Sequence, residues 1–299
     1  MAGTWRHLCI LSMIRIDVVC PLHLADEEIG GVIEGLKAQQ DIELHKVVFP
    51  LTEEGDLTNV IAQIEAAGYT YFLVPKPEFS HSLTRQKAMM EHCESDVVLM
   101  MSQDVRFAGE RAVAELCGAV SADVPYAFGK QICTRRSIER YTREKNYGKE
   151  SLLVGAADVE EMQLTAFFAS DAFSAYHRPT FVEIGGYDDV HMMMNEDMYY
   201  AKKVIDRGLK KAYVATAVVE HSHKYKLKQL YNRYRATGEW FAAHPEFDGY
   251  KTTDSGMKLA KYVLKRALRD FNIPVLFRFF PDMTSRYLGM KKGKKKSKA

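Results

Sequence analysis

Three short groups of residues in this 299-residue chain combine residue types that can do chemistry. They are the runs Ser102 to Asp104, Asn195 to Asp197 and His221 to His223. Carboxylate oxygens suit hard cations such as Mg²⁺ and Mn²⁺, and a neutral imidazole can join such a site. Of two adjacent carboxylates, one can be tuned toward accepting a proton. The runs therefore indicate a divalent metal site and a general base, although acids also commonly cap helices without any further role.

The segments before residue 130 alternate β-rich runs with amphipathic stretches. We predict strands over 14–20, 42–49, 69–74 and 97–101. Between them, apolar residues recur at helical spacing over 29–36, behind an N-cap expected at Asp26, and over 60–64, before Gly68. This order predicts an α/β fold with a mostly parallel central sheet. Because such sheets bind ligands at the carboxyl ends of their strands, Ser102 to Asp104 lie where a ligand is expected.

The composition favours a folded protein in a reducing compartment. Hydrophobic residues make up 47% of the chain, which is enough for a sizeable core. The five cysteines, at positions 9, 20, 93, 117 and 133, form no C-x-x-C pair and no metal-finger spacing, so we expect buried thiols and a cytoplasmic protein. No run approaches the ~18 apolar residues of a transmembrane helix.

Positive charge is concentrated at the end of the chain. Six lysines lie within residues 291–299, and removing their charges from the formal net charge of +2 leaves −4 for the rest. The body therefore lacks the basic character of a protein that binds nucleic acid. Two interpretations of the lysine run stay open, namely a contact with anionic lipid at the inner face of the membrane and a solvated end.

Two further segments each allow two interpretations. After residue 225 the chain is helical and aromatic, over 225–241 and 258–271, with more aromatic residues between 277 and 287. These helices fit an interfacial membrane anchor or a layer packed on the catalytic core. The charged segment 134–161 fits a mobile acceptor-side loop or a solvated helix.

Several motifs resemble those of family 2 glycosyltransferases with the GT-A fold, in particular bacterial rhamnosyltransferases. The resemblance is good over about residues 70–240 and includes the motif-bearing segments Glu78–Gln86, Val98–Asp104, Phe168–Arg178, Ile184–Tyr187, Asn195–Asp197 and Ala217–His223, with a further match at Arg286–Gly289. It implies a GT-A domain over 13–224 and a C-terminal helical extension with a basic tail over 225–299.

The resemblance also implies roles for single residues. Asp197 is expected to be the general base, with Glu196 as its neighbour. Asp104, His221 and His223 are expected to hold a divalent metal, Mg²⁺ or Mn²⁺, with His221 favoured over His223. The residues expected to contact the donor are His81, Arg85, Gln103 and Asp104.

The activity implied is an inverting transfer of a sugar, rhamnose from dTDP-rhamnose, to a saccharide or lipid-linked acceptor in cell-surface polysaccharide synthesis. Two alternatives are a metal-dependent hydrolase using the same acids and histidines, and a non-catalytic nucleotide-sugar-binding scaffold. The chain departs from the family at 21–23 and 50–54, where segments that hold the nucleoside are replaced, and at Ser102, which replaces the first acid of Asp-x-Asp. The nucleoside base and a strict metal requirement therefore stay open, as do the acceptor, the linkage and the oligomeric state.

Overall fold

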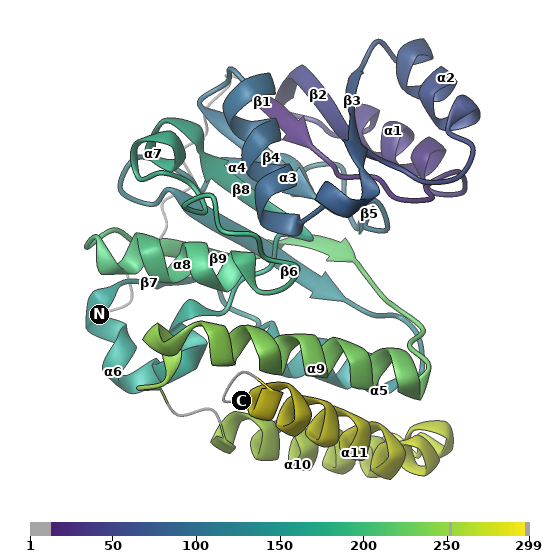
Figure 1. Cartoon of the computed structure of the whole chain (residues 1–299), viewed down its shortest axis with the longest axis vertical. Helices are drawn as coiled ribbons and strands as arrows, with labels where there is room; N and C mark the ends of the chain where they lie inside the picture. The colour runs from purple at the N-terminus through teal and green to yellow at the C-terminus, as the bar shows by residue number, and fades with distance from the viewer. Residues whose placement is uncertain (1–12, 251–252, 297–299) are drawn as a thin grey trace.

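The protein is built around one nine-stranded sheet, described here from a computed structural model that covers residues 13–250 and 253–296 (Figure 1). The strands are β1 Ile14–Val19, β2 Ile42–Glu53, β3 Thr70–Pro75, β4 Val97–Met101, β5 Arg106–Phe107, β6 Tyr126–Ile132, β7 Leu152–Val154, β8 Phe173–His177 and β9 Lys211–Glu220. The α-helices are α1 Ile29–Lys37, α2 Thr58–Ala66, α3 His81–Lys87, α4 Ala112–Cys117, α5 Ile138–Asn146, α6 Val159–Met162, α7 Arg178–Glu183, α8 Glu196–Asp206, α9 Leu227–Ala243, α10 Thr253–Arg269 and α11 Ile273–Lys296.

The sheet is mixed and mostly parallel, as the alternating pattern predicts. Its order is β3-β2-β1-β4-β8-β6-β9-β5, with β7 also paired to β9. The four adjacent strands β3, β2, β1 and β4 are all parallel to one another. Strand β8 is antiparallel to both β4 and β6, and β6 is parallel to β9. The carboxyl ends of β4, β6 and β9 therefore meet at one edge, where β8 begins, and the residues that follow these strands become neighbours.

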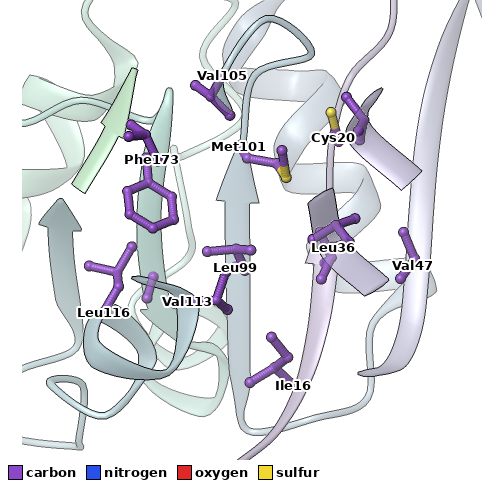
Figure 2. Packing of buried hydrophobic residues seen from close by; sticks show 14 of the residues in the cluster. Ile16, Cys20, Leu36, Val47, Leu99, Met101, Val105, Val113, Leu116 and Phe173 are labelled. Carbon is purple, nitrogen blue, oxygen red and sulfur yellow. The ribbon is translucent and has the colours of Figure 1, made fainter. Parts of the chain in front are cut away.

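Alternating side chains of each central strand form a separate core on either face of the sheet. Ile16 and Leu99 belong to the core beneath α1 and α4, whereas Val19 and Val98 belong to the core on the opposite face, with α7 and α8. Figure 2 shows the first core, where Ile16, Leu99 and Met101 lie together between the strands and the covering helices. Because both faces are covered, β4 is apolar throughout, whereas β1 buries Asp17, which accepts hydrogen bonds from Ser95.

One local expectation is wrong, and another is confirmed. Asp26 does not cap the first helix, since α1 begins at Ile29 after a turn, and the Asp26 carboxylate instead accepts a hydrogen bond from Asn59 at 3.3 Å. Cys20, Cys93, Cys117 and Cys133 are buried free thiols, as expected, and burial raises the pKa of Cys93 to about 12. Cys9 lies outside the described residues.

The C-terminal helices pack on the rest of the chain through one face. Trp240 of α9 and the nearby Phe247 belong to the core on the α8 side of the sheet, so this core continues across the predicted boundary at 224 and 225. Helices α10 and α11 form a smaller core with Ile138 and Tyr141 of α5. The segment 134–161 is thus neither a bare loop nor a fully solvated helix, because α5 lies between the sheet and these helices. In the described part of the chain, no helix has both the length and the apolar character that a membrane crossing needs.

Helices α9 and α11 contact each other backbone to backbone at three glycines. A Cβ on Gly293 would overlap the carbonyl oxygen of Arg235, and one on Gly289 would overlap that of Tyr231. Gly238 lies equally close to the backbone of Met290. Much of the lysine-rich end, up to residue 296, is therefore part of a packed helix, and Lys294 lies over the Phe241 ring at 5.5 Å. Residues 297–299 of the lysine run lie outside the described part.

We expect Gly293→Ala to lower the free energy of unfolding by about 1–3 kcal/mol, because the added methyl group forces α9 and α11 apart. The matched control is Gly256→Ala in α10, where an added Cβ meets nothing within 4 Å. Both substitutions gain helix propensity, about 1 kcal/mol, so only the close contact separates them. Thermal unfolding followed by circular dichroism measures both. Equal melting temperatures for the two variants would contradict the close packing.

Candidate active site

Asp104, His221 and His223 meet at the carboxyl edge of the sheet. Asp104 follows β4, the two histidines follow β9, and the short strand β5 pairs with the end of β9. One Asp104 oxygen lies 3.2 Å from Nε2 of His221, and the other lies 3.2 Å from Nδ1 of His223. Among the described residues they form the one group of three potential metal ligands, with ligand atoms within 4.8 Å of one another.

The His221 ring is oriented by Gln131 of β6. Its Nδ1 lies 2.9 Å from Oε1 of Gln131, an oxygen that also accepts a hydrogen bond from Arg143 of α5. The amide nitrogen of Gln131 donates to Ser170 at 2.8 Å, which leaves Oε1 as the acceptor. This contact orients the His221 ring so that Nε2 faces Asp104, and the tautomer with its proton on Nδ1 would leave Nε2 free to bind a cation.

The protonation of this group suits a cation. Burial alone would raise the pKa of Asp104, but the hydrogen bond and charge of His221 and the charge of His223 lower it below its ordinary value. Burial and the charge of His221 lower the pKa of His223 to about 4. At neutral pH Asp104 is therefore a carboxylate and His223 a neutral imidazole. Neighbouring ligands of an octahedral cation lie about 3 Å apart, which the two 3.2 Å separations match.

Glu196 and Asp197 begin helix α8, as predicted. The residue before them, Asn195, has a left-handed backbone with φ 60°, which asparagine tolerates. Glu196 is buried and paired with the guanidinium of Arg85 from α3. Burial alone would lower the pKa of Arg85, but the charges of Glu196 and Asp171 raise it, so the arginine stays charged. The sequence predicts a donor contact for Arg85, and the structure pairs it with Glu196.

Asp197 differs from its neighbour because it is only partly buried and has no basic partner like Arg85. Its Oδ1 accepts a hydrogen bond from the backbone of Met198 at 2.7 Å. Burial and the charges of Glu196 and Asp171 raise the pKa of Asp197 well above its ordinary value. A carboxylate with a raised pKa is a better proton acceptor at neutral pH than an ordinary one. Asp197 therefore has the properties of a general base.

A buried carboxylate, Asp171, contributes negative charge near this pair. Tyr126, Tyr176 and Ser174 donate to one Asp171 oxygen, and Tyr187 donates to the other at 2.9 Å. Tyr187 reaches this position from the turn at Gly185 and Gly186, both with positive φ, and a Cβ on Gly186 would lie 2.7 Å from a side-chain oxygen of Gln86. The Ile184–Tyr187 motif thus forms a glycine turn that positions a ring against Asp171.

Arg233 and Tyr225 also belong to the site, and the motifs do not point to them. Nη1 of Arg233 donates to the Tyr225 hydroxyl at 3.1 Å, and the Tyr225 ring lies 5.0 Å from that of His223. Burial lowers the pKa of His81 and of His223 and raises that of Glu196, and the charge of Arg233 adds to the first two shifts and opposes the third. This exposed guanidinium therefore lies near both the metal-ligand group and the carboxylate pair. The sequence held one indication of Arg233, namely that it lies in the predicted helix that begins just after His221 to His223.

His81 follows the end of β3, and Gln103 follows the end of β4. His81 is the first residue of α3, and burial, with the charges of Arg85 and Arg233, lowers its pKa to about 3, so it is neutral. The Gln103 side chain bonds both backbone groups of His23, at 2.8 and 3.0 Å. His23 in turn lies 2.6 Å from Glu54, which also pairs with Lys76. The ends of β1 to β4 are linked in this way.

Two curated proteins resemble this chain over most of its length, whereas no family model matches it. The chain is 29% identical over 290 residues to the O-antigen chain rhamnosyltransferase RfbN of Salmonella typhimurium, covering 94% of this chain and 90% of that protein. It is 32% identical over 240 residues to the O-antigen chain rhamnosyltransferase WbaN of Salmonella anatum, covering 77% and 74%.

Solved structures share the fold at low sequence identity. A mannosyltransferase from Pyrobaculum calidifontis, in complex with GDP-mannose and Mn²⁺, matches with a TM-score of 0.53 and 13% identity, over 93% of this chain and 72% of that one. GalNAc-T7 with UDP, GalNAc and Mn²⁺ matches with a TM-score of 0.53 and 12% identity, over 85% and 55%. The predicted GT-A fold is thereby confirmed. With the identity to WbaN, this shows that the chain belongs to the rhamnosyltransferases of the GT-A glycosyltransferase fold.

Proposed function

We propose that this rhamnosyltransferase moves rhamnose from dTDP-rhamnose to a saccharide acceptor of a growing O-antigen chain, with inversion at the anomeric carbon. The transferred sugar and the polysaccharide are those that the names of its curated relatives give. The observation that carries the proposal is the meeting of Asp104, His221 and His223 at the sheet edge that also holds the Glu196 and Asp197 pair.

The proposed reaction is one in-line displacement. An acceptor hydroxyl oxygen bonds to the anomeric carbon, the bond from that carbon to the β-phosphate oxygen breaks, and the hydroxyl proton passes to Asp197. The nucleoside diphosphate leaves with the electron pair of the broken bond. A single displacement inverts the anomeric carbon, and it needs one base rather than a nucleophile on the protein.

The leaving diphosphate requires positive charge, and the site offers two sources. Asp104 and the two imidazoles would hold Mg²⁺ or Mn²⁺, which when bound supplies positive charge to the phosphate oxygens. The exposed guanidinium of Arg233 lies within electrostatic reach of His223 and Glu196 and suits a fork contact to a phosphate. His81, neutral and half-buried at the start of α3, suits a contact to the donor.

Arg85 is assigned a positioning role in this proposal. Its buried pairing with Glu196 fixes the first turn of α8 and so the direction of Asp197. Gln103 holds the backbone of His23, and the linked side chains of His23, Glu54 and Lys76 occupy the strand ends where the nucleoside would lie. His23 and Glu54 lie in the two segments that depart from the family pattern, so the choice of dTDP in this proposal rests on the resemblance to rhamnosyltransferases.

We expect Asp104→Asn to weaken Mn²⁺-dependent binding of dTDP-rhamnose at least about tenfold, because the substitution removes a charged ligand but preserves side-chain size. Calorimetry with Mn²⁺ or a chelator measures this without turnover. Asp41→Asn is the matched control. Asp41 precedes β2, is exposed and pairs with Arg111, so the same substitution there should leave donor binding unchanged. Binding that is equal with Mn²⁺ and with chelator in the unaltered protein would contradict a metal role.

Asp197→Asn should lower kcat for transfer by about 10²–10⁴-fold while donor binding stays within a factor of a few, because the amide cannot accept the proton. Asp206→Asn at the other end of α8, where Asp206 pairs with Lys202 at 2.6 Å, is the control. Transfer is followed by separation of the saccharide product. Near-normal turnover by Asp197→Asn would rule out its role as base, and sugar release without an acceptor would favour the hydrolase.

The pH profile tests the same base. Because Asp197 acts when ionised and its pKa is raised, kcat/KM should rise with pH at values above those of an ordinary aspartate and then level off. Glu196→Gln removes the adjacent charge while keeping an oxygen for Arg85, so the pKa of Asp197 falls and the rise moves to lower pH. A rise that stays at the same pH in Glu196→Gln would show that another group controls the profile.

A further inference from the structure

Helices α10 and α11 expose large apolar side chains at the turn that joins them. Phe271 is 85% exposed, Phe277 81% and Phe280 71%. Leu268 and Ile273, at the two sides of the same turn, are also exposed. We call these five residues the apolar tip. Exposing three nearly free phenylalanines forfeits about 2 kcal/mol of burial for each, so a patch of this kind marks an interaction surface.

The apolar tip follows from the way these helices pack. Val263 and Ala267 of α10 and Val275 and Phe279 of α11 face α5 and form the small core there. Ile273, Phe277 and Phe280 are spaced by four and three residues, so they share the opposite face of α11. That face is left without a partner among the described residues.

The charge around the tip is strongly positive. Residues 256–295 contain eleven lysines and arginines and two acids, Asp270 and Asp282. Asp270 pairs with Arg266 at 3.3 Å, and Asp282 pairs with Arg286 at 2.6 Å. Lys261, Lys265 and Arg269 on α10 are exposed. Two copies of this face would repel each other, whereas an anionic surface would attract it.

The tip lies beside the active site. Arg278 of α11 donates to the backbone oxygen of Tyr225, whose ring contacts that of His223. In Figure 1 the arrowheads of β6 and β9, the start of α9 and the turn between α10 and α11 all lie toward the right of the molecule. The metal-ligand group, which follows β9, and the apolar tip therefore face the same side.

We propose that the apolar tip inserts into the interface of a bilayer that contains anionic lipids. The aromatic rings enter the boundary between headgroups and acyl chains, while Lys265 and Arg269 contact the lipid phosphates. Docking in this orientation turns the mouth of the active site toward the membrane. This consequence rests on the proposed function, because it makes the acceptor a saccharide carried on a membrane lipid.

The test measures co-sedimentation of the full chain with vesicles of phosphatidylcholine and phosphatidylglycerol at physiological salt, without donor or acceptor. We expect the double variant Phe271→Ser, Phe277→Ser to bind at least about tenfold more weakly than the unaltered chain. The matched control is Leu73→Ser, Val182→Ser, which replaces two residues of 45% and 44% exposure on β3 and α7. Because all four side chains are exposed, equal melting temperatures are expected.

A second measurement places the rings directly. In a Phe277→Trp variant the fluorescence should shift to shorter wavelength on addition of these vesicles, and much less with phosphatidylcholine alone. No sedimentation of the unaltered chain, or equal loss in the tip and control variants, would overturn the proposal. A concentration-dependent dimer that the tip variant abolishes would assign the surface to a second copy instead. Donor-dependent transfer to a soluble acceptor, which the tip variant should retain, tests the proposed function separately.

Discussion

The buried ion pair between Arg85 and Glu196 is the interaction on which the geometry of the site depends. It joins α3 to the first turn of α8 across 111 positions of sequence. Removing either partner would leave an unpaired charge in a dry environment, which typically costs about 3–5 kcal/mol. The pair is therefore a rigid connection, and Asp197, the next residue along, is directed outward because its neighbour is held inward.

The same pair makes the adjacent carboxylates unequal. Glu196 forms an ion pair with Arg85, whereas Asp197 has no such partner. The negative charges of Glu196 and Asp171, together with burial, therefore raise the pKa of Asp197. Asp171 can stay buried because three tyrosines and a serine satisfy its oxygens, and burial raises the pKa of these tyrosines well above the ordinary value, so they remain donors. Two identical functional groups side by side thus acquire different properties from their surroundings.

The sequence predicted those parts of the site that follow from the order of the strands. Asp104 and the two histidines each come directly after a strand, and parallel strands bring such residues to one edge without further information. Residues that act across long separations were not predictable: Gln131 orients His221 from 90 positions away, and Arg233 enters from a helix with no family motif. The Asp26 cap failed for a related reason, since its partner Asn59 belongs to another helix.

Helix α9 connects catalysis to the surface that we assign to the membrane. One side of it presents Arg233 toward His223 and Glu196, and another side contacts α11 through Gly238, Gly289 and Gly293 with no side chains between the two backbones. Side chains at an interface can change rotamer, whereas two backbones in direct contact cannot slide without breaking the contact. The angle between the apolar tip and the site is therefore fixed by the fold. A protein docked through the tip would therefore hold Asp197 and the metal ligands at a fixed distance from the membrane surface. That distance would determine which hydroxyl of a lipid-linked acceptor can reach Asp197.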